Sequence, residues 1–270
     1  MASFGPAPLF TNHVDLHQAS THKVKNPTTV SAYPIATGSS VFGIKYDEGV
    51  LMGADTLVSY GKMARYPNVQ RLYKVNESTV ITCTGDFADF QEITSMLERM
   101  QIEEERTQNE VTMQPRSLHI YLTRYLYKKR TDFDPKWTNI VVGGMQDGVP
   151  YLGYINMIGL AYTEDAVTTG LGGSIALPLM RKLKDQHPDR ALTFNEARGV
   201  MEESLKLGFA LDCVAYPKFQ IATITKEGVK IGEPQTVALD WKYVKGFPGH
   251  SLINIFFLLF YLYIETIKFP

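Results

Sequence analysis

The stretch TGSSVFGIKYDEGVLMGAD, residues 37–55, decides the fold class. Two runs within it, 40–46 and 50–54, are typical of β-strands because they are rich in β-branched and aromatic residues. Residues 47–49, Asp-Glu-Gly, form a short turn between them. The stretch therefore predicts a β-hairpin near the start of the folded part of the chain.

The elements outside this hairpin follow in blocks. Two helices are predicted from an apolar stripe within 90–100 and from Pro115, which suits a first helical turn. Thr193 and Glu196 form a capping-box pattern at the start of a later helix. The other predicted elements are strands at 79–84, 139–142 and 151–154, a helix from about Ser174, and strands at 219–224 and 229–231. The predicted elements thus come in blocks: strands, two helices, strands, two helices, and strands again. This block order, rather than a strict alternation of strands and helices, predicts an antiparallel, layered α+β fold.

The composition fits one large domain or two small ones, since the chain has 270 residues and 44% of them are hydrophobic. The formal net charge is −1, from 27 basic and 28 acidic side chains, so no nucleic-acid partner is predicted. Two cysteines, Cys83 and Cys213, make no disulfide framework, and Cys83 is predicted to be a core residue of an apolar strand. We therefore expect a reducing compartment, cytosol or nucleus.

Both ends differ from the middle of the sequence. Residues 1–35 contain four prolines and no apolar run long enough for a signal peptide, so we expect a flexible arm or a removable leader. Near the other end, the apolar run LINIFFLLFYLYI at 252–264 is shorter than the roughly 20 residues that span a bilayer. A buried or interface-docked tail is therefore favoured over a membrane anchor, and an incorrectly predicted gene end is a further alternative.

Several familiar motifs are absent or incomplete. The glycine-rich run Gly170–Ser174 lacks the Gly-Lys-Ser/Thr ending of a phosphate loop, so a tight turn is the simpler interpretation. The six histidines form no His-Glu-x-x-His motif and no Cys/His cluster, and no Gly-x-Ser-x-Gly elbow occurs. The sequence therefore predicts neither a cofactor nor a metal.

Polar residues around the hairpin form a more specific pattern. Ser39 follows a glycine and opens the first strand, and Asp55 closes the second strand sixteen positions later. Further along, Arg71 shortly precedes a Tyr-Lys-Val run, and Thr84-Gly85-Asp86 ends another strand. The pattern continues in Tyr60-Gly61, Ala64-Arg65, Asp86–Gln91, Leu122-Thr123-Arg124, Asp134–Trp137 and Phe219–Thr223.

Through these motifs, residues 36–246 resemble the beta subunits of the proteasome core particle. The resemblance implies a four-layer αββα sandwich of the N-terminal-nucleophile hydrolase type. In active members, an N-terminal threonine attacks a peptide carbonyl with its own amine as the general base. A buried lysine helps to move protons, a glycine N–H stabilises the oxyanion, and aspartates and serines complete the polar network.

Part of this site is retained when its positions are transferred to the chain. The nucleophile position falls on Ser39, whose hydroxyl could attack in principle. The first aspartate falls on Asp55, the oxyanion glycine on Gly85 and the second aspartate on Asp212. An ion pair between Asp55 and Arg71, and a turn glycine at Gly85, are the simpler structural interpretations.

The remaining positions have lost their chemistry. The lysine position falls on Arg71, and arginine cannot relay a proton because it stays charged at physiological pH. The two serine positions fall on Leu171 and Ala215, which have no hydroxyl group. Because groups that act as a unit fail together, we expect no intact catalytic set. The predicted function is a non-catalytic structural beta subunit for ATP- and ubiquitin-dependent protein degradation, and the alternative is an active endopeptidase that uses Ser39.

A silent subunit would act through its surfaces. The resemblance implies that the partners are other proteasome alpha and beta subunits in stacked seven-membered rings, in the cytoplasm and nucleus. It also implies a propeptide within the arm 1–35, the beta-type domain at 36–234 and a C-terminal extension at 235–249, followed by the apolar tail at 250–270. Two aromatic residues of the extension, Trp241 and Tyr243, are expected to be interface anchors, although they could also fold back on their own domain.

Overall fold

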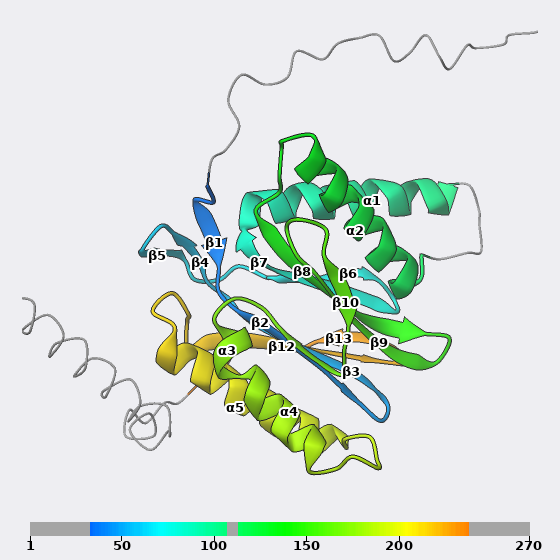
Figure 1. Ribbon diagram of the computed structural model, residues 1–270, viewed down its shortest axis with the longest axis vertical. Helices are drawn as coiled ribbons and strands as arrows, with labels where there is room; N and C mark the ends of the chain where they lie inside the picture. The colour runs from blue at the N-terminus through cyan, green and yellow to red at the C-terminus, as the bar shows by residue number, and fades with distance from the viewer. Residues whose placement is uncertain (1–32, 107–112, 238–270) are drawn as a thin grey trace, which may run out of the picture. The chain divides into compact units, whose positions relative to one another are not determined.

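The computed structural model describes residues 33–106 and 113–237 (Figure 1). Two antiparallel sheets lie face to face, and helices cover the outer side of each sheet. This arrangement confirms the predicted four-layer αββα sandwich. The segments before Tyr33 and after Val237 lie outside the described residues, and so do the predicted anchors Trp241 and Tyr243.

The first sheet has the strand order β10-β9-β8-β7-β1-β4-β5, and β6 also pairs with β7. Its strands are β1 (Ala36–Gly38), β4 (Val58–Tyr60), β5 (Met63–Tyr66), β6 (Leu72–Asn76), β7 (Thr79–Asp86), β8 (Thr138–Gln146), β9 (Val149–Ile155) and β10 (Ala161–Thr163). Helices α1 (Phe87–Arg106) and α2 (Pro115–Thr131) cover its outer face.

The second sheet has the order β11-β2-β3-β12-β13, and β14 also pairs with β12. Its strands are β2 (Val41–Tyr46), β3 (Gly49–Asp55), β11 (Ala166–Thr168), β12 (Lys218–Thr225), β13 (Gly228–Ile231) and β14 (Gln235–Thr236). Helices α3 (Gly172–Ile175), α4 (Leu177–Asp185) and α5 (Phe194–Leu211) cover its outer face. The start of the predicted C-terminal extension therefore belongs to this sheet through β14.

Local signals explain where the helices begin and end. The capping box at the start of α5 is confirmed, because Thr193 and Glu196 exchange hydrogen bonds between side chain and backbone. Pro115 is in the first turn of α2, as expected. The single helix expected from Ser174 is instead two helices, α3 and α4. Pro178, in the first turn of α4, has no N–H to continue the α3 hydrogen-bond ladder.

The central hairpin lies between two apolar layers, so both of its faces are buried. Phe42 and Ile44 of β2 point into the core shared with α4 and α5, whereas Val41 belongs to the core between the sheets. The strands pair from Val41 opposite Ala54 to Tyr46 opposite Gly49. This register brings the start of β2 and the end of β3, and with them Ser39 and Asp55, to the same end of the second sheet.

His119 is a buried titratable group between α2 and β9. Its Nε2 lies 3.1 Å from the carbonyl oxygen of Tyr154 and its Nδ1 lies 2.7 Å from the hydroxyl of Tyr151. Because a carbonyl can only accept, Nε2 carries the proton and Nδ1 accepts from the tyrosine. Burial lowers the pKa of His119, since the charged form is poorly solvated there.

Acidification should therefore destabilise the fold through His119. The unfolded chain binds a proton at this residue before the folded chain does, so stability falls as the pH drops below about 6.5. His119→Gln keeps a donor and an acceptor but does not titrate, and it should flatten this part of the pH profile. Urea unfolding of both chains between pH 5 and pH 8 measures the difference, and identical profiles would contradict the assignment.

Candidate functional site

Three of the predicted site residues meet at one end of the second sheet. Ser39 lies between β1 and β2, Asp55 ends β3, and Arg71 immediately precedes β6. All three are buried, and Arg71 is only 1% exposed. Sequence reasoning placed these residues in one site, and the structure brings them together.

Arg71 is the centre of this group. Its Nη1 donates to the Asp55 carboxylate, in an ion pair, and to the Ser39 hydroxyl at 3.2 Å. Its Nη2 donates to the carbonyl oxygen of Ser39 and to that of Cys83, at 2.8 Å in the second case. The guanidinium also lies against Gly38, where an added Cβ would come within 2.6 Å of it. Arg71 therefore links β3, β7 and the connection between β1 and β2 through donated hydrogen bonds, and it forms the expected ion pair with Asp55.

Asp55 is held by two elements. Its Oδ2 accepts from the backbone N–H of Tyr216 at 2.9 Å, while its Oδ1 faces Arg71. Burial raises the pKa of the Asp55 carboxyl, and the Arg71 charge together with the Tyr216 hydrogen bond opposes that rise. The carboxylate is thus stabilised by a fixed cation and a fixed amide.

Cys83 is a core residue, as predicted. It is fully buried in β7, and burial raises the pKa of its thiol to about 12. A thiol with such a pKa is protonated at neutral pH and is a poor nucleophile. Its contribution to the site is the backbone carbonyl that binds Arg71.

Gly85 has a backbone conformation that residues other than glycine rarely adopt. Its φ is 103°, and a Cβ at this position would lie 2.2 Å from the carbonyl oxygen of Trp137. Gly85 pairs with Gly38 on one side and with Thr138 on the other. The retained glycine therefore has a conformational and packing reason to be present.

Asp212 and Ala215 line a small cavity together with Ser39 and Asp55. The cavity measures about 10 Å³, which is room for about one water molecule. Asp212 is also the C-cap residue that follows α5, and its Oδ1 accepts from the N–H of Val214 at 3.0 Å. The cavity itself is too small for a peptide side chain.

Leu171 lies apart from this group. It is 44% exposed and precedes α3, and it does not line the small cavity. The neighbouring turn contacts the site through its backbone, because Gly172 N–H donates to the Ser40 hydroxyl at 2.9 Å. The family serine position is therefore apolar and turned toward solvent.

Hydroxyl groups that sequence reasoning did not assign surround Ser39. Thr84 Oγ1 donates to the Ser39 carbonyl at 3.1 Å and also contacts Thr169 Oγ1. Thr169 Oγ1 accepts from the N–H of Val41 at 3.0 Å. Thr84 belongs to the motif Thr84-Gly85-Asp86, but the sequence assigned no role to it. Thr169 lies far from Ser39 in the sequence, so no motif spacing could have identified it.

The segment before Ser39 lies inside the first sheet. Strand β1 pairs with β4 on one side, with Gly38 opposite Val58, and with β7 on the other, with Gly38 opposite Gly85. Ile35, the last residue of the predicted arm, donates its N–H to Asp86 Oδ2 at 3.0 Å, and its carbonyl accepts from Gly61 at 3.0 Å. The chain that leads to Ser39 therefore fills the space between two strands next to the site.

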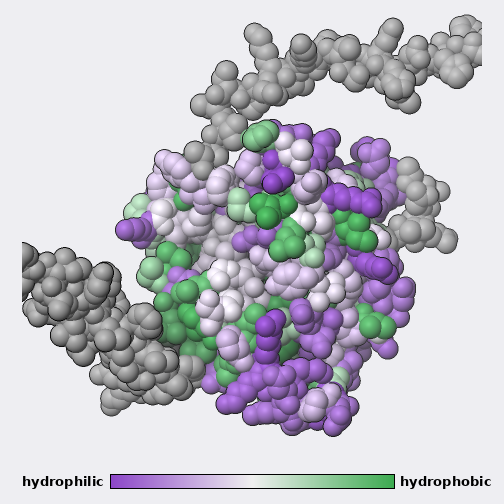
Figure 2. All heavy atoms as spheres, in the orientation of Figure 1, coloured by the Kyte–Doolittle hydropathy of each residue, from purple (hydrophilic) through white to green (hydrophobic). Residues whose placement is uncertain are grey.

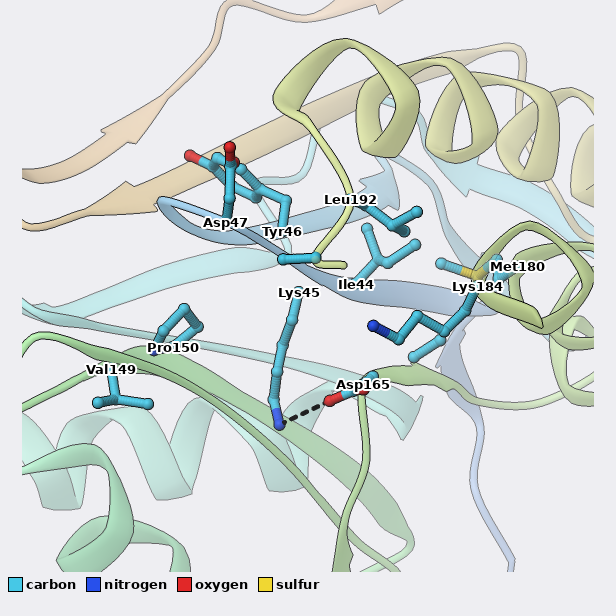
Figure 3. Close-up of a pocket in the computed structure, with 12 residues that line it drawn as sticks. Ile44, Lys45, Tyr46, Asp47, Val149, Pro150, Asp165, Met180, Lys184 and Leu192 are labelled. Atoms are coloured by element: carbon cyan, nitrogen blue, oxygen red, sulfur yellow. Dashed lines mark hydrogen bonds and ion pairs between the residues drawn. The ribbon is translucent and has the colours of Figure 1, made fainter. Parts of the chain in front are cut away.

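A larger pocket lies at the other end of β2. It measures about 280 Å³, slightly below the usual range of about 300–1,000 Å³ for ligand sites. Figure 3 shows the Lys45 side chain extended toward Asp165, with which it forms an ion pair at 3.3 Å. The apolar side chains of Met180 and Leu192 also line the pocket. The described residues that line it include none of the predicted site residues, so this pocket is separate from the Ser39 site.

Metal-ligand clusters and membrane-spanning helices are both absent from the described part of the chain. Within residues 33–106 and 113–237, His, Cys, Asp and Glu side chains form no group of three or more that could hold a metal ion. No helix in the same ranges has both the length and the apolar character needed to cross a membrane.

Comparison with known proteins defines the class to which this fold and site belong. The family model for proteasome subunits matches residues 35–224, and the chain belongs to this family. The chain is similar to proteasome subunit beta type-4 of Xenopus laevis, with 35% identity over 216 residues that cover 80% of this chain and 88% of the relative. It is equally similar to proteasome subunit beta type-4 of Arabidopsis thaliana, with 35% identity over 211 residues that cover 78% and 84%. A probable proteasome subunit beta type-7 of Schizosaccharomyces pombe is 35% identical over 227 residues, which cover 83% and 87%. The predicted family is thus confirmed.

Proposed function

We propose that this protein is a structural, non-catalytic beta subunit of the proteasome core particle. The observation that carries the proposal is the position of Arg71. Its guanidinium lies where active relatives are expected to have a lysine, and it donates to Ser39, Asp55 and Cys83 at once. A permanently charged group in this place holds the strands together but cannot pass a proton to or from Ser39.

The backbone at Ser39 supports the same function. Gly38, which immediately precedes Ser39, belongs to β1, and this strand pairs with β4 on one side and with β7 on the other. On the proposed function the mature chain keeps β1, and the Ser39 nitrogen then stays a peptide amide. An amide nitrogen cannot act as the general base that an N-terminal amine provides.

Each retained family residue has a structural role of its own. Asp55 is the counter-ion of Arg71, Gly85 adopts a backbone conformation that excludes other residues, and Asp212 is the C-cap residue of α5. Their presence therefore does not require catalysis. On this basis the protein contributes surfaces to the particle rather than a reaction.

The partners follow from the same proposal. Relatives named proteasome subunit beta type-4 support assembly with other proteasome subunits, and we propose that these are alpha and beta subunits in stacked seven-membered rings. Cytoplasm and nucleus are the proposed location, which the free thiols of Cys83 and Cys213 support, since disulfides are rare in those compartments.

Intact-mass analysis of the chain taken from assembled particles tests the proposal. We expect the mature chain to begin upstream of Ser39 and to remain unmodified by a peptide epoxyketone at concentrations that label an active beta subunit in the same particles. The active subunit in the same sample is the internal control for the probe. A chain that begins at Ser39 and acquires the mass of the probe would overturn the proposal in favour of a Ser39 endopeptidase.

A Ser39→Ala variant provides the matched control. The assembled particle should keep its full peptidase activity against every substrate class, because Ser39 contributes no reaction. A selective loss of one activity would show that Ser39 acts as a nucleophile.

A further inference from the structure

Phe133 has a strained backbone conformation and a largely solvent-exposed aromatic ring. Its φ is 57°, in the left-handed region, and its side chain is 87% exposed. Left-handed backbone is unfavourable for a bulky residue because its Cβ crowds the following carbonyl oxygen. Such conformations are kept where the surroundings fix them, and they are frequent at functional positions.

The end of α2 fixes this conformation. Asp134 N–H donates to the carbonyl of Lys129 at 3.0 Å and Phe133 N–H donates to that of Arg130 at 3.3 Å, which is the hydrogen-bond pattern of a Schellman motif. An ion pair between Lys129 and Asp134 at 3.0 Å closes the same turn. Glycine is the usual residue at the left-handed position of this motif. Since glycine would end the helix at lower cost, the reason for phenylalanine must lie in its side chain.

More exposed apolar side chains lie around the end of this helix. Tyr127 is on α2, and the connection between β9 and β10 presents Ile158 and Leu160. The connection packs on the helix, because a Cβ at Gly159 would lie 2.6 Å from the Cβ of Tyr127. Figure 2 shows green, hydrophobic spheres among purple ones at this end of the molecule, where α2 ends in Figure 1. We call Tyr127, Phe133, Ile158 and Leu160 the α2-end surface.

The charges near the α2-end surface are mainly positive. Arg124, Lys128 and Arg130 are exposed on the last turns of α2, and the Arg130 guanidinium lies 5.9 Å from the Tyr127 ring centre. Lys129 and Asp134 neutralise each other, which leaves Asp132 as the acidic group of this turn. Two copies that met through this face would bring like charges together. Charge complementarity therefore favours a partner surface rich in carboxylates.

We propose that the α2-end surface docks on a different subunit, with Phe133 inserted in an apolar pocket whose rim carries Asp or Glu side chains. Exposed aromatic residues surrounded by arginine and smaller apolar groups are frequent energetic centres of interfaces. The inference rests on the proposed function, because it assigns one of the contacts through which a structural subunit would enter the particle.

Phe133→Gly separates folding from docking, because the two effects have opposite signs. Glycine relieves the left-handed strain, so the melting temperature of the full-length chain should rise by about 2–4 °C. Loss of the anchor should reduce incorporation by at least tenfold when the variant competes with differently tagged wild-type chain in the same cells. Asp147→Gly is the matched control, since Asp147 is the other non-glycine residue with positive φ among the described residues, at 50°. It should raise the melting temperature by a smaller amount, because aspartate tolerates left-handed backbone better than phenylalanine does, and it should incorporate like the wild type.

Photo-crosslinking identifies the occupant. With p-benzoylphenylalanine in place of Phe133, irradiation of assembled particles should link this chain to a different subunit, at a site flanked by Asp or Glu residues. A crosslink to a second copy, or to the terminal segments of this chain itself, would overturn the proposed occupant. Equal incorporation of Phe133→Gly and wild type would overturn the docking role. If the wild-type chain itself elutes alone as a monomer, the proposed function fails before the docking inference is reached.

Discussion

Replacing Arg71 with methionine should lower the free energy of unfolding by about 3–5 kcal/mol, because it leaves a buried carboxylate without its counter-ion. Methionine fills much of the same volume, so the loss measures the missing charge and hydrogen bonds more than a cavity. Asp55, the hydroxyl and carbonyl of Ser39, and the carbonyl of Cys83 all lose a donor at once. Urea unfolding should show a midpoint lowered by at least about 1 M at the slopes typical of small domains.

Two companion variants decide whether the charge is the cause. Arg181→Met removes an exposed arginine from α4 and should change stability by no more than about 0.5 kcal/mol. Adding Asp55→Asn to Arg71→Met removes the stranded charge and keeps an acceptor for Tyr216 N–H. The double variant should therefore recover part of the lost stability. If it is no more stable than the single variant, packing rather than charge holds the two residues.

The pH dependence of Arg71→Met gives a further check. Burial already raises the pKa of Asp55, and removing Arg71 removes the main influence that opposes this rise. In the variant, the folded state takes up a proton at Asp55 before the unfolded state does. Stability relative to the wild type should therefore improve as the pH falls from 8 to 5 and worsen as it rises. A difference that is constant over this range would contradict the assignment.

Periodicity predicts the long helices of this fold because they repeat their pattern often enough. The helices α1, α2 and α5 each bury residues at regular spacing over several turns. The hairpin of β2 and β3 is buried on both faces, so its signal is the β-branched and aromatic residues and the Asp-Glu-Gly turn rather than an alternation. The strands β1, β4, β10 and β11 have three residues each, too few for an alternation to be recognised. These short strands exist because of partners elsewhere: β11 pairs with β2, and β1 with β4 and β7.

Part of the candidate site could likewise be predicted from the sequence, and part could not. Ser39, Asp55 and Arg71 could be assigned from the sequence because the family pattern gives each of them a position, and the hairpin register brings the first two together. The hydroxyl contacts around them could not, since Thr169 meets Val41 across 128 residues of sequence and Gly172 meets Ser40 across 132. Leu171 shows the limit of such a transfer, because the position is matched but the side chain faces solvent.

Gly85→Ala should destabilise the fold by about 2–5 kcal/mol, the sum of left-handed strain and a collision with backbone. The new Cβ would lie 2.2 Å from the carbonyl oxygen of Trp137. That carbonyl cannot move easily, because it accepts from Asp86 N–H at 2.7 Å while Trp137 N–H donates to Asp89 at 2.8 Å. Urea midpoints of variant and wild type, compared at equal slopes, give the loss.

Gly61→Ala is the control that separates strain from collision. Gly61 also has positive φ, at 58°, but a Cβ there would meet nothing within 4 Å. Its cost should be about 1–2 kcal/mol, from the left-handed backbone alone. If both alanine variants lost the same stability, the close approach of Trp137 would not explain Gly85. If Gly85→Ala loses clearly more, the glycine at the family's oxyanion position is required for packing, and its presence beside Arg71 does not by itself indicate catalysis.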